Sequence, residues 1–178
     1  MGGLCLPGEG LSLREFTAAD EDALHAIVSD PQVTAFTDWG PNRPAETRAF
    51  LATAVAQADS PEVRLGYHMA AVTADDLLVG SATLDVKSPQ HRRAELGFVF
   101  APQHWGRGYA TEATRLLLAF GFGDLGLHRI SADCHPDNPA CARVLEKAGM
   151  RLEGRLRDHE FVRGAWRDSL VYARLADD

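Results

Sequence analysis

Apolar and polar residues alternate in two rhythms along this chain. A change at every second residue, with β-branched and aromatic side chains, is typical of strands and occurs in seven segments. Apolar residues at three- and four-residue steps are typical of amphipathic helices and occur in four segments. We therefore predict strands near residues 11–16, 66–73, 77–86, 94–100, 127–134, 150–161 and 166–175, and helices near residues 17–30, 44–58, 109–122 and 139–148.

The most informative stretch, residues 94–122, joins a predicted strand to a long predicted helix through a glycine loop. The N–H groups of such a loop and of the first helical turn are unpaired, and the helix dipole adds partial positive charge there. Gly106 and Gly108 let the backbone approach a ligand closely, and Arg107 between them offers further donors for phosphate oxygens. The pattern therefore predicts a pyrophosphate-binding turn.

Other phosphate-binding loops fit these residues less well. A Walker-type loop needs a Lys-Ser or Lys-Thr pair after its second glycine, and none follows Gly108. A dinucleotide fingerprint needs a third glycine at the position that Thr111 occupies. A strand-to-helix turn that needs glycines only for steric reasons remains the alternative interpretation.

Composition and charge limit the classes of protein. A length of 178 residues, with 46% hydrophobic and 24% charged residues, suits one globular domain, which we place at residues 11–178 after a flexible segment at residues 1–10. The formal charge of −7 and a pI near 5.4 argue against a nucleic-acid partner. No long apolar run predicts a membrane span or a leader, so a cytoplasmic protein is expected.

Cysteine and histidine spacing gives no framework for disulfides or metals. Cys5, Cys134 and Cys141 are an odd number without paired spacing. The seven histidines and three cysteines show neither the H-x-x-x-H nor the C-x-x-C spacing that is common in zinc sites, so we predict no metal.

Two motifs together resemble the GNAT superfamily of N-acyltransferases. The first is Gln103-x-x-Gly106-x-Gly108 between an extended run and a long helix. The second is Asn138-x-x-Cys141, followed by a short helical pattern that ends at Gly149. The predicted hairpin before residue 94 resembles the RimJ/RimL-type branch, as does the pattern of Gly164, Trp166, Asp168 and Tyr172 near the end. That branch acetylates N-terminal amines of ribosomal proteins and, in many members, other amines.

The resemblance implies an α/β fold: one GNAT-like domain with a mostly antiparallel, splayed central sheet flanked by helices. It also implies acetyl-CoA or another acyl-CoA as cosubstrate, with the strand at 94–100 parting from the strand at 127–134 to admit the pantetheine arm. Asn138 would help to position the thioester, although an Asx turn before the helix is the alternative. The implied cosubstrate-binding residues are Phe98, Val99, Phe100, Gln103, His104, Trp105, Gly106, Arg107, Gly108, Tyr109, Ala110 and Asn138.

Glu95 is the candidate general base, directly or through a water molecule. Alternation places its side chain on the same strand face as Gly97 and Val99, close to the expected thioester. Partial burial would raise the pKa of this carboxyl group. The alternative is a solvated carboxylate or an ion-pair partner of a nearby arginine. A backbone N–H, that of Val99 or a neighbour, is the candidate oxyanion donor.

The general acid stays open at this level. Many relatives carry a tyrosine or serine where this chain has Cys141, and a thiol is a weak hydrogen-bond donor. Cys141 is a catalytic candidate, either as a weak donor to the leaving thiolate or as an acyl-accepting nucleophile, although no histidine is placed beside it. The alternative is a small buried helix residue. Tyr109 and Tyr172 are further candidates.

The predicted activity is acyl-CoA-dependent N-acyl transfer to a primary amine of a small molecule, a peptide or a protein. The alternative is a CoA-binding sensor or assembly module without catalysis. The resemblance also makes a homodimer plausible. The acceptor would enter between the loop at 36–43 and the hairpin at 158–166, where the candidate contacts are Phe36, Asp38, Trp39, Asp158 and Glu160. For the three acidic residues, a solvated surface charge is the alternative.

Overall fold

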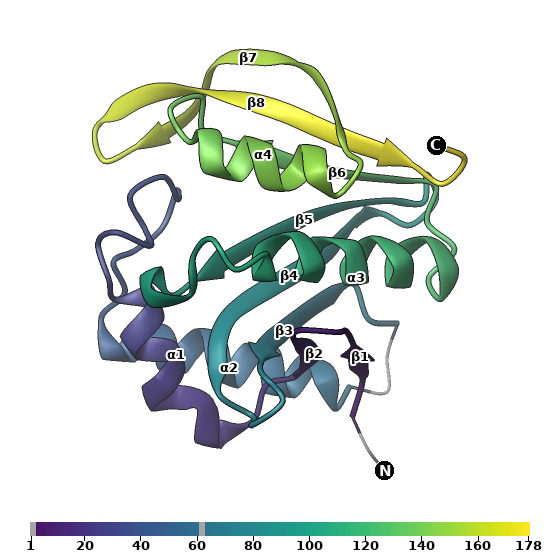
Figure 1. Cartoon of the computed structure of the whole chain (residues 1–178). Helices are drawn as coiled ribbons and strands as arrows, with labels where there is room; N and C mark the ends of the chain where they lie inside the picture. The colour runs from purple at the N-terminus through teal and green to yellow at the C-terminus, as the bar shows by residue number, and fades with distance from the viewer. Residues whose placement is uncertain (1–2, 61–62) are drawn as a thin grey trace.

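Across residues 3–60 and 63–178, which the computed structural model describes, eight strands form one mixed sheet and four α-helices pack against it (Figure 1). The strand order is β1-β2-β3-β4-β5-β6-β8-β7. The strands are β1 (Cys5–Pro7), β2 (Ser12–Glu15), β3 (Gly66–Val72), β4 (Leu78–Ser88), β5 (Arg93–Phe100), β6 (Arg129–Cys134), β7 (Arg151–Val162) and β8 (Ala165–Leu175). The helices are α1 (Glu21–Val28), α2 (Pro44–Ala58), α3 (Tyr109–Gly123) and α4 (Pro139–Lys147), with 3₁₀ turns η1 (Ala18–Asp20) and η2 (Pro102–His104).

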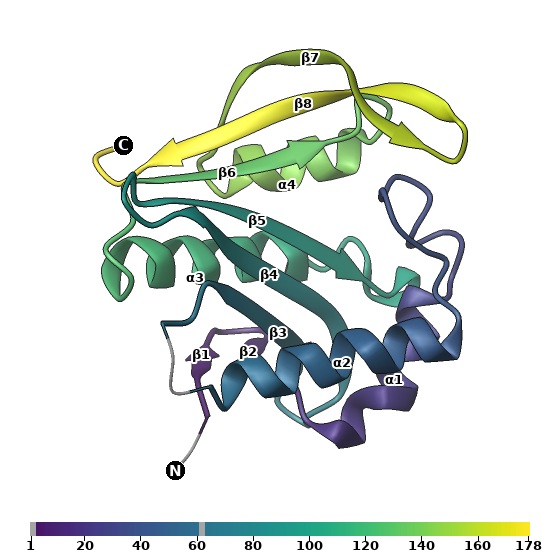
Figure 2. The same cartoon turned by 180° about the vertical axis from the view of Figure 1, so that it is seen from behind.

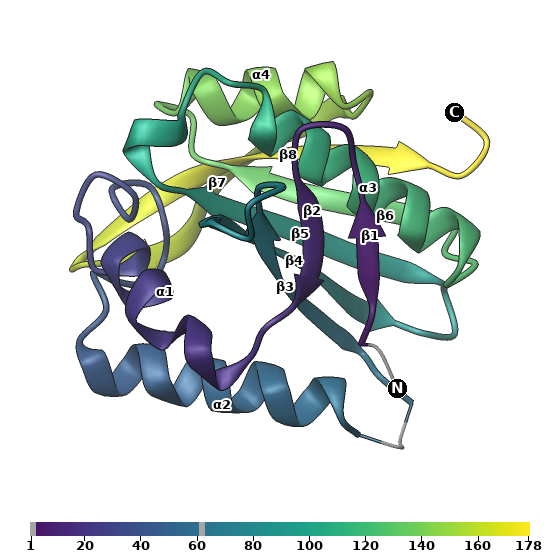
Figure 3. The same ribbon diagram turned by 60° about the horizontal axis from the view of Figure 1, so that its bottom comes forward.

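The helices divide between the two faces of the sheet (Figure 3). Helices α3 and α4 cover one face, where Leu84, Leu117 and Ile130 are fully buried in the larger core. Helices α1 and α2 cover part of the other face through Leu24 and Leu51 in a smaller core. The amphipathic stripes of the helices thus pair with the apolar face of each strand, as the periodicity predicts.

One part of the sheet lies uncovered by helices. Helices α1 and α2 pack on β2, β3 and β4, and in Figure 2 no helix of the described chain lies in front of β5, β6 and β8. Leu96 and Ala132 point to the core on the α3 side, so the alternate residues Glu95 and Asp133 point away from it. We call this side of β5, β6 and β8, together with the adjoining part of β4 around Asp85, the open face.

The sheet splits between β5 and β6. These two strands are parallel neighbours, but their pairing covers only residues 93–95 of β5 and 129–131 of β6. Beyond Glu95 the strands diverge (Figure 2), while β5 stays paired with β4 as far as Phe100. The remaining strand pairs are antiparallel. The predicted fold class, a mostly antiparallel and splayed sheet with flanking helices, is confirmed.

Two details differ from the sequence-based expectation. The composition of residues 1–10 predicts a loose segment, but Cys5–Pro7 form β1 on the edge of the sheet. The N–H groups of Glu9 and Gly10 also donate to the Glu112 carboxylate of α3, at 2.5 and 2.9 Å. The polar stretch at 87–93 predicts a turn, and residues 89–92 form one, but β4 continues through Ser88 beyond an irregularity in its register. Long-range backbone pairing thus orders segments whose local composition favours loops.

Candidate active site

The glycine loop between β5 and α3 forms an open cradle of backbone amides. Gly106 and Gly108 have φ angles of 75° and 84°, in the left-handed region that glycine enters without strain. A Cβ atom added to either would meet nothing within 4 Å. Within the described part of the chain, the N–H groups of Gly106, Arg107 and Gly108 donate to no backbone carbonyl. Gly108 is also the N-cap of α3, so unpaired amides and the positive end of the helix dipole meet at this loop, as an anion site requires.

Side chains on either side of the cradle hold it in place. The Trp105 indole N–H donates to the Phe100 carbonyl at 2.7 Å, although 53% of this residue is exposed. The His104 ring lies 6.3 Å from the Tyr109 ring, between their centroids. Gln103 and Arg107 are exposed beside the glycines. Trp105 therefore supports the loop, and its bond occupies one of the backbone groups that the resemblance assigns to the pantetheine arm.

The edge of β5 beyond Glu95 supplies the backbone for an extended ligand. Phe98, Val99 and Phe100 lie past the last residue that pairs with β6. Phe98 packs at the margin of the core, with its ring 6.4 Å from that of Phe100. The structure thus places these three residues between the glycine cradle and Glu95.

Asn138 and Cys141 occupy the start of α4. The Asn138 side-chain oxygen accepts a hydrogen bond from the Cys141 N–H at 3.1 Å and caps the helix, so the predicted Asx interaction is present. A hydrogen bond to the Cys134 thiol, together with burial, raises the pKa of Cys141 far above the ordinary range of a thiol. Cys141 therefore stays protonated and is a poor nucleophile.

The two tyrosine candidates for the general acid differ in position. Tyr172 is 2% exposed, and its hydroxyl donates to the Glu146 carboxylate at 3.2 Å. Burial and that carboxylate raise the pKa of Tyr172 to about 12. Tyr109 is half-buried and opens α3 next to the cradle. Tyr172 and Cys141 thus lie on the α4 side and Tyr109 on the cradle side.

Glu95 lies on the open face at the point where β5 and β6 part. It pairs with Asp85 of β4 and with Ser131 of β6, so all three side chains share that face. Burial raises the pKa of Glu95, and the nearby carboxylates of Asp133, Asp85 and Glu160 raise it further, whereas Lys87 lowers it. The balance leaves a half-buried carboxyl group with an elevated pKa.

Other polar groups surround Glu95 on this face. Burial raises the pKa of Asp85, but a hydrogen bond and the charge of His68 outweigh it and leave the value lowered. His159 donates to or accepts from the Ser169 hydroxyl at 3.0 Å and lies 3.9 Å from the Asp133 carboxylate. The open face therefore carries several carboxylates close to one another. Their negative charges repel each other, and a cationic group near Glu95 would reduce that repulsion.

The loop at 31–43 and the β7–β8 hairpin meet beside the open face (Figure 1). The Arg163 guanidinium, at the tip of the hairpin, lies 2.9–3.2 Å from the carbonyl oxygens of Thr34, Thr37, Trp39 and Gly40. One charged side chain thus joins the two segments between which the acceptor is predicted to enter.

The predicted acceptor contacts lie in or near these two segments without gathering at one point. The Phe36 ring lies 5.1 Å from the His135 ring, between their centroids, while Asp38 and Trp39 are exposed. Asp158 adopts a φ of 46° in an irregular stretch of β7, and its N–H donates to Asp168. Glu160 contacts Arg167 at 3.5 Å and lies close enough to Glu95 to raise its pKa.

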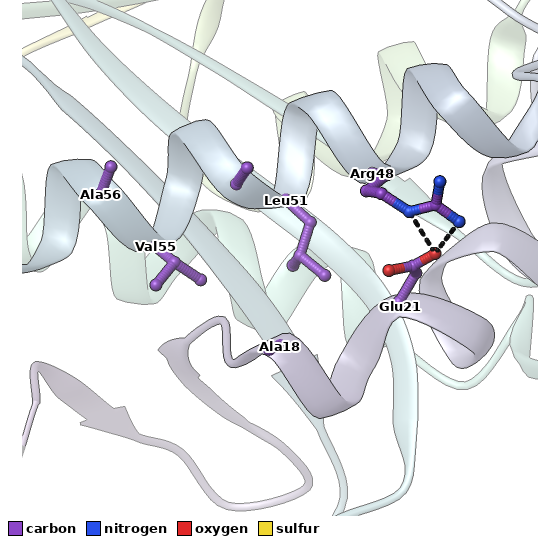
Figure 4. A pocket seen from close by; sticks show the side chains of 7 residues that line it. Ala18, Glu21, Arg48, Leu51, Val55 and Ala56 are labelled. Atoms are coloured by element: carbon purple, nitrogen blue, oxygen red, sulfur yellow. Dashed lines mark hydrogen bonds and ion pairs between the residues drawn. The ribbon is translucent and has the colours of Figure 1, made fainter.

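Hollows also occur away from the cradle in the part of the chain that the structure describes. One, of about 240 Å³, lies on the open face next to Glu95 and is lined by Lys87, Arg93, Arg129 and Ser131, among others. Another, of about 370 Å³, lies between α1 and α2 and is mostly apolar, with the ion pair of Arg48 and Glu21 at its rim (Figure 4). In residues 3–60 and 63–178, no helix is long and apolar enough to cross a bilayer, and no group of three potential ligands could hold a metal ion.

Comparison with known families agrees with this geometry. A family model described as the acetyltransferase (GNAT) domain matches residues 11–151, which include the cradle, Glu95 and α4. The chain belongs to the GNAT acetyltransferase family. It is therefore an N-acetyltransferase, and enzymes of this family transfer an acetyl group from acetyl-CoA to amines of small molecules or proteins.

GNAT relatives match almost the whole chain. An uncharacterized N-acetyltransferase of Bacillus subtilis (strain 168), YoaA, is 31% identical over 169 residues, which are 94% of each chain. The crystal structure of a GNAT acetyltransferase from Bacillus anthracis has a TM-score of 0.88 and 30% identity, and covers 98% of this chain and 100% of its own. A spermidine N-acetyltransferase from Vibrio cholerae, solved with CoA and spermine, shares the fold with a TM-score of 0.82 and 22% identity, over 96% and 98% of the two chains.

Sequence reasoning missed three features of this GNAT site. The Arg163 bridge joins residues 123 to 129 positions apart, and the contact between Cys134 and Cys141 depends on how α4 packs on β6. Asp85 and Asp133 lie near Glu95 only because of the strand order. The first two have no sequence signal, but a hairpin register for β4 and β5 would have placed Asp85 opposite Glu95.

Proposed function

We propose that this enzyme acetylates a primary amine that binds on the open face, with Glu95 as general base, directly or through one water molecule. The observation that carries the proposal is the position of Glu95: it is half-buried, with an elevated pKa, at the residue where β5 leaves β6. A base of this kind must accept a proton near neutral pH, and an elevated pKa suits that task.

The gap between β5 and β6 would let acetyl-CoA, bound at the cradle and along β5, meet an amine that binds on the open face. The cradle at Gly106 and Gly108 would hold the pyrophosphate, and the free edge of β5 would bond the pantetheine arm. When bound, acetyl-CoA supplies an electrophilic thioester carbonyl. Glu95 takes one proton from the bound ammonium, directly or through water, so that the neutral amine can attack the carbonyl. The second N–H proton passes to solvent as the C–N bond forms, a backbone N–H at or near Val99 holds the oxyanion, and a protein acid protonates the thiolate once the C–S bond breaks.

The acceptor is proposed at the level of chemistry. The carboxylates near Glu95 favour the binding of a protonated amine group. A place in the RimJ/RimL-type branch, a homodimer and a cytoplasmic location stay predictions.

A thiol-release screen tests the proposal. Acetyl- and succinyl-CoA are offered with peptides bearing free N-termini, polyamines, aminoglycosides and amino acids, and the product is identified by mass spectrometry. We expect acetyl-CoA and at least one class of primary amine to release thiol and form an amide. Tight binding of acetyl-CoA with no turnover of any amine would support a non-catalytic CoA-binding module instead.

A further inference from the structure

Three cations gather at one end of the open face of this otherwise acidic protein. Lys87, Arg93 and Arg129 line the hollow of about 240 Å³ together with Ser131 and Val171. The formal net charge of the chain is −7, so this is a local reversal of sign. We call this hollow the Arg93 pocket.

The strand register fixes where this pocket lies relative to the candidate base. Arg93 pairs with Arg129 across β5 and β6, and Glu95 pairs with Ser131 in the next row on the same face. Two residues along a strand span roughly 7 Å. The cations of the pocket therefore form the row next to the carboxylate that is proposed to deprotonate the acceptor.

The charges of the pocket are unevenly compensated. The Arg129 guanidinium pairs with both oxygens of Glu153. The side chains of Lys87 and Arg93 make no hydrogen bond or ion pair with any described residue. Lys87 lies near the carboxylates of Asp85 and Glu95, and it lowers the pKa of each. Arg93 is thus the cation with the least compensation, in a hollow where an anion would approach it.

We propose that the Arg93 pocket binds an anionic group, a carboxylate or a phosphate, of the same acceptor whose amine lies at Glu95. This inference rests on the proposed function and narrows its acceptor. The substrate class is then an amine with an acidic group a few bonds away, such as an amino acid, a short peptide or an aminoalkyl phosphate. A polyamine fits less well, because its second ammonium would face Lys87 and Arg93.

Matched acceptors test this inference. γ-Aminobutyrate is compared with γ-aminobutyramide, β-alanine with its amide, and aminoethyl phosphate with ethanolamine, with putrescine as the dication. We expect kcat/KM to be at least tenfold higher for the anionic member of a pair, with an advantage that shrinks as salt is added. Equal values in all pairs, or a preference for putrescine, would overturn the inference. The carboxylate and phosphate pairs identify the preferred anion.

Variants separate the pocket from general charge effects. Arg93→Gln and Lys87→Gln are expected to reduce the ratio of kcat/KM between γ-aminobutyrate and γ-aminobutyramide about tenfold. Arg48→Gln removes the same charge from α2, where Arg48 pairs with Glu21, and should leave the ratio as in the parent enzyme. An unchanged ratio in Arg93→Gln would contradict the inference.

A binding measurement keeps the two proposals apart. If no amine releases thiol, the proposed function fails, and calorimetric titration of γ-aminobutyrate and γ-aminobutyramide into the enzyme with CoA still tests the pocket. Selective binding of the anionic compound, lost in Arg93→Gln, supports the pocket. If amines do react but neither rate nor binding distinguishes the pair, the proposed function stands and the pocket is wrong.

Discussion

The cosubstrate side and the acceptor side of this enzyme are built in opposite ways. The cradle consists of backbone amides from one continuous stretch of chain between β5 and α3, with Gly106 and Gly108 leaving it open. The open face is instead a set of charged side chains brought together from different strands, among them Asp85, Glu95 and Asp133. One side depends on the shape of the main chain and the other on the identity of side chains.

This difference explains why the cradle can recognise a group common to all acyl-CoAs, whereas the open face can select among acceptors. A pyrophosphate presents the same charge in every acyl-CoA, and amides at a helix N-terminus recognise it whatever the neighbouring side chains are. An acceptor amine is recognised by charges whose sign and position can change with a single substitution. We therefore expect substitutions in the cradle to act on all acceptors alike, and substitutions on the open face to act on turnover, pH dependence or acceptor choice.

The largest expected effect belongs to Glu95→Gln. The amide keeps the size of the side chain but cannot take a proton, so turnover should fall roughly a thousandfold. Affinity for acetyl-CoA, measured by calorimetry, should stay within about twofold, because the cradle and the β5 edge are untouched. Parent-like turnover with an unchanged pH–rate profile would remove Glu95 from the mechanism.

A matched control for this variant is Glu153→Gln. Glu153 lies on β7, where it pairs with Arg129, and is not among the groups that change the pKa of Glu95. It loses the same charge and should keep most of the turnover with a neutral acceptor. A comparable loss in both variants would indicate that net charge, rather than proton transfer, governs the rate.

Gly108→Val should weaken acetyl-CoA binding about a hundredfold for every acceptor. Valine places a side chain in the cradle and is strained at a φ of 84°, where glycine is comfortable. Calorimetric titration with acetyl-CoA measures the loss. Unchanged affinity would show that the pyrophosphate is bound elsewhere.

Two further variants separate blocking from strain. Gly108→Asn tolerates the left-handed conformation but still fills the cradle, so it should also weaken binding. Gly123→Val lies in open space at the other end of α3 and should bind acetyl-CoA normally. If Gly108→Asn binds as well as the parent enzyme, the effect of valine is strain and the cradle itself is not the contact.

The difference between a local cradle and an open face assembled from distant strands also determined which parts of the structure could be predicted from the sequence. The cradle, α3 and the Asn138 cap are local, so glycine spacing and helical periodicity were sufficient to place them. The split between β5 and β6 followed from the resemblance. The neighbours of Glu95 were predicted poorly, since Asp133 comes close only through the pairing of β6 with β5, and the irregular stretch of β7 has no sequence signal. Long-range strand order decides those contacts.

Arg163→Ala should affect acceptors more than acetyl-CoA. The variant loses contacts to four carbonyls of the loop at 31–43, so the loop is less fixed beside the open face. We expect KM for the acceptor to rise about tenfold, with kcat and the affinity for acetyl-CoA changed less than threefold. Arg157→Ala, in the same hairpin and exposed, serves as control. An equal effect on acetyl-CoA affinity would show that the bridge stabilises the whole domain.

The smallest effects, and the most specific, concern the pH dependence of the rate. Glu95 works as a base only when it is ionised, so activity falls as the pH drops through its elevated pKa. Asp133→Asn removes a negative neighbour and should lower the pKa of Glu95, which moves the acid limb of kcat/KM to lower pH. Lys87→Gln removes a positive neighbour and should move that limb to higher pH.

The acceptor's own ionisation does not affect the comparison of these two variants. The same acceptor, with no charged group other than its amine, is used in every assay, so the pKa of that amine contributes equally to every pH–rate profile. We expect rates at neutral pH to change less than about threefold, while the two acid limbs shift in opposite directions. Shifts in the same direction would mean that the titrating group in the profile is not Glu95, because a positive and a negative neighbour cannot act alike on one carboxyl group.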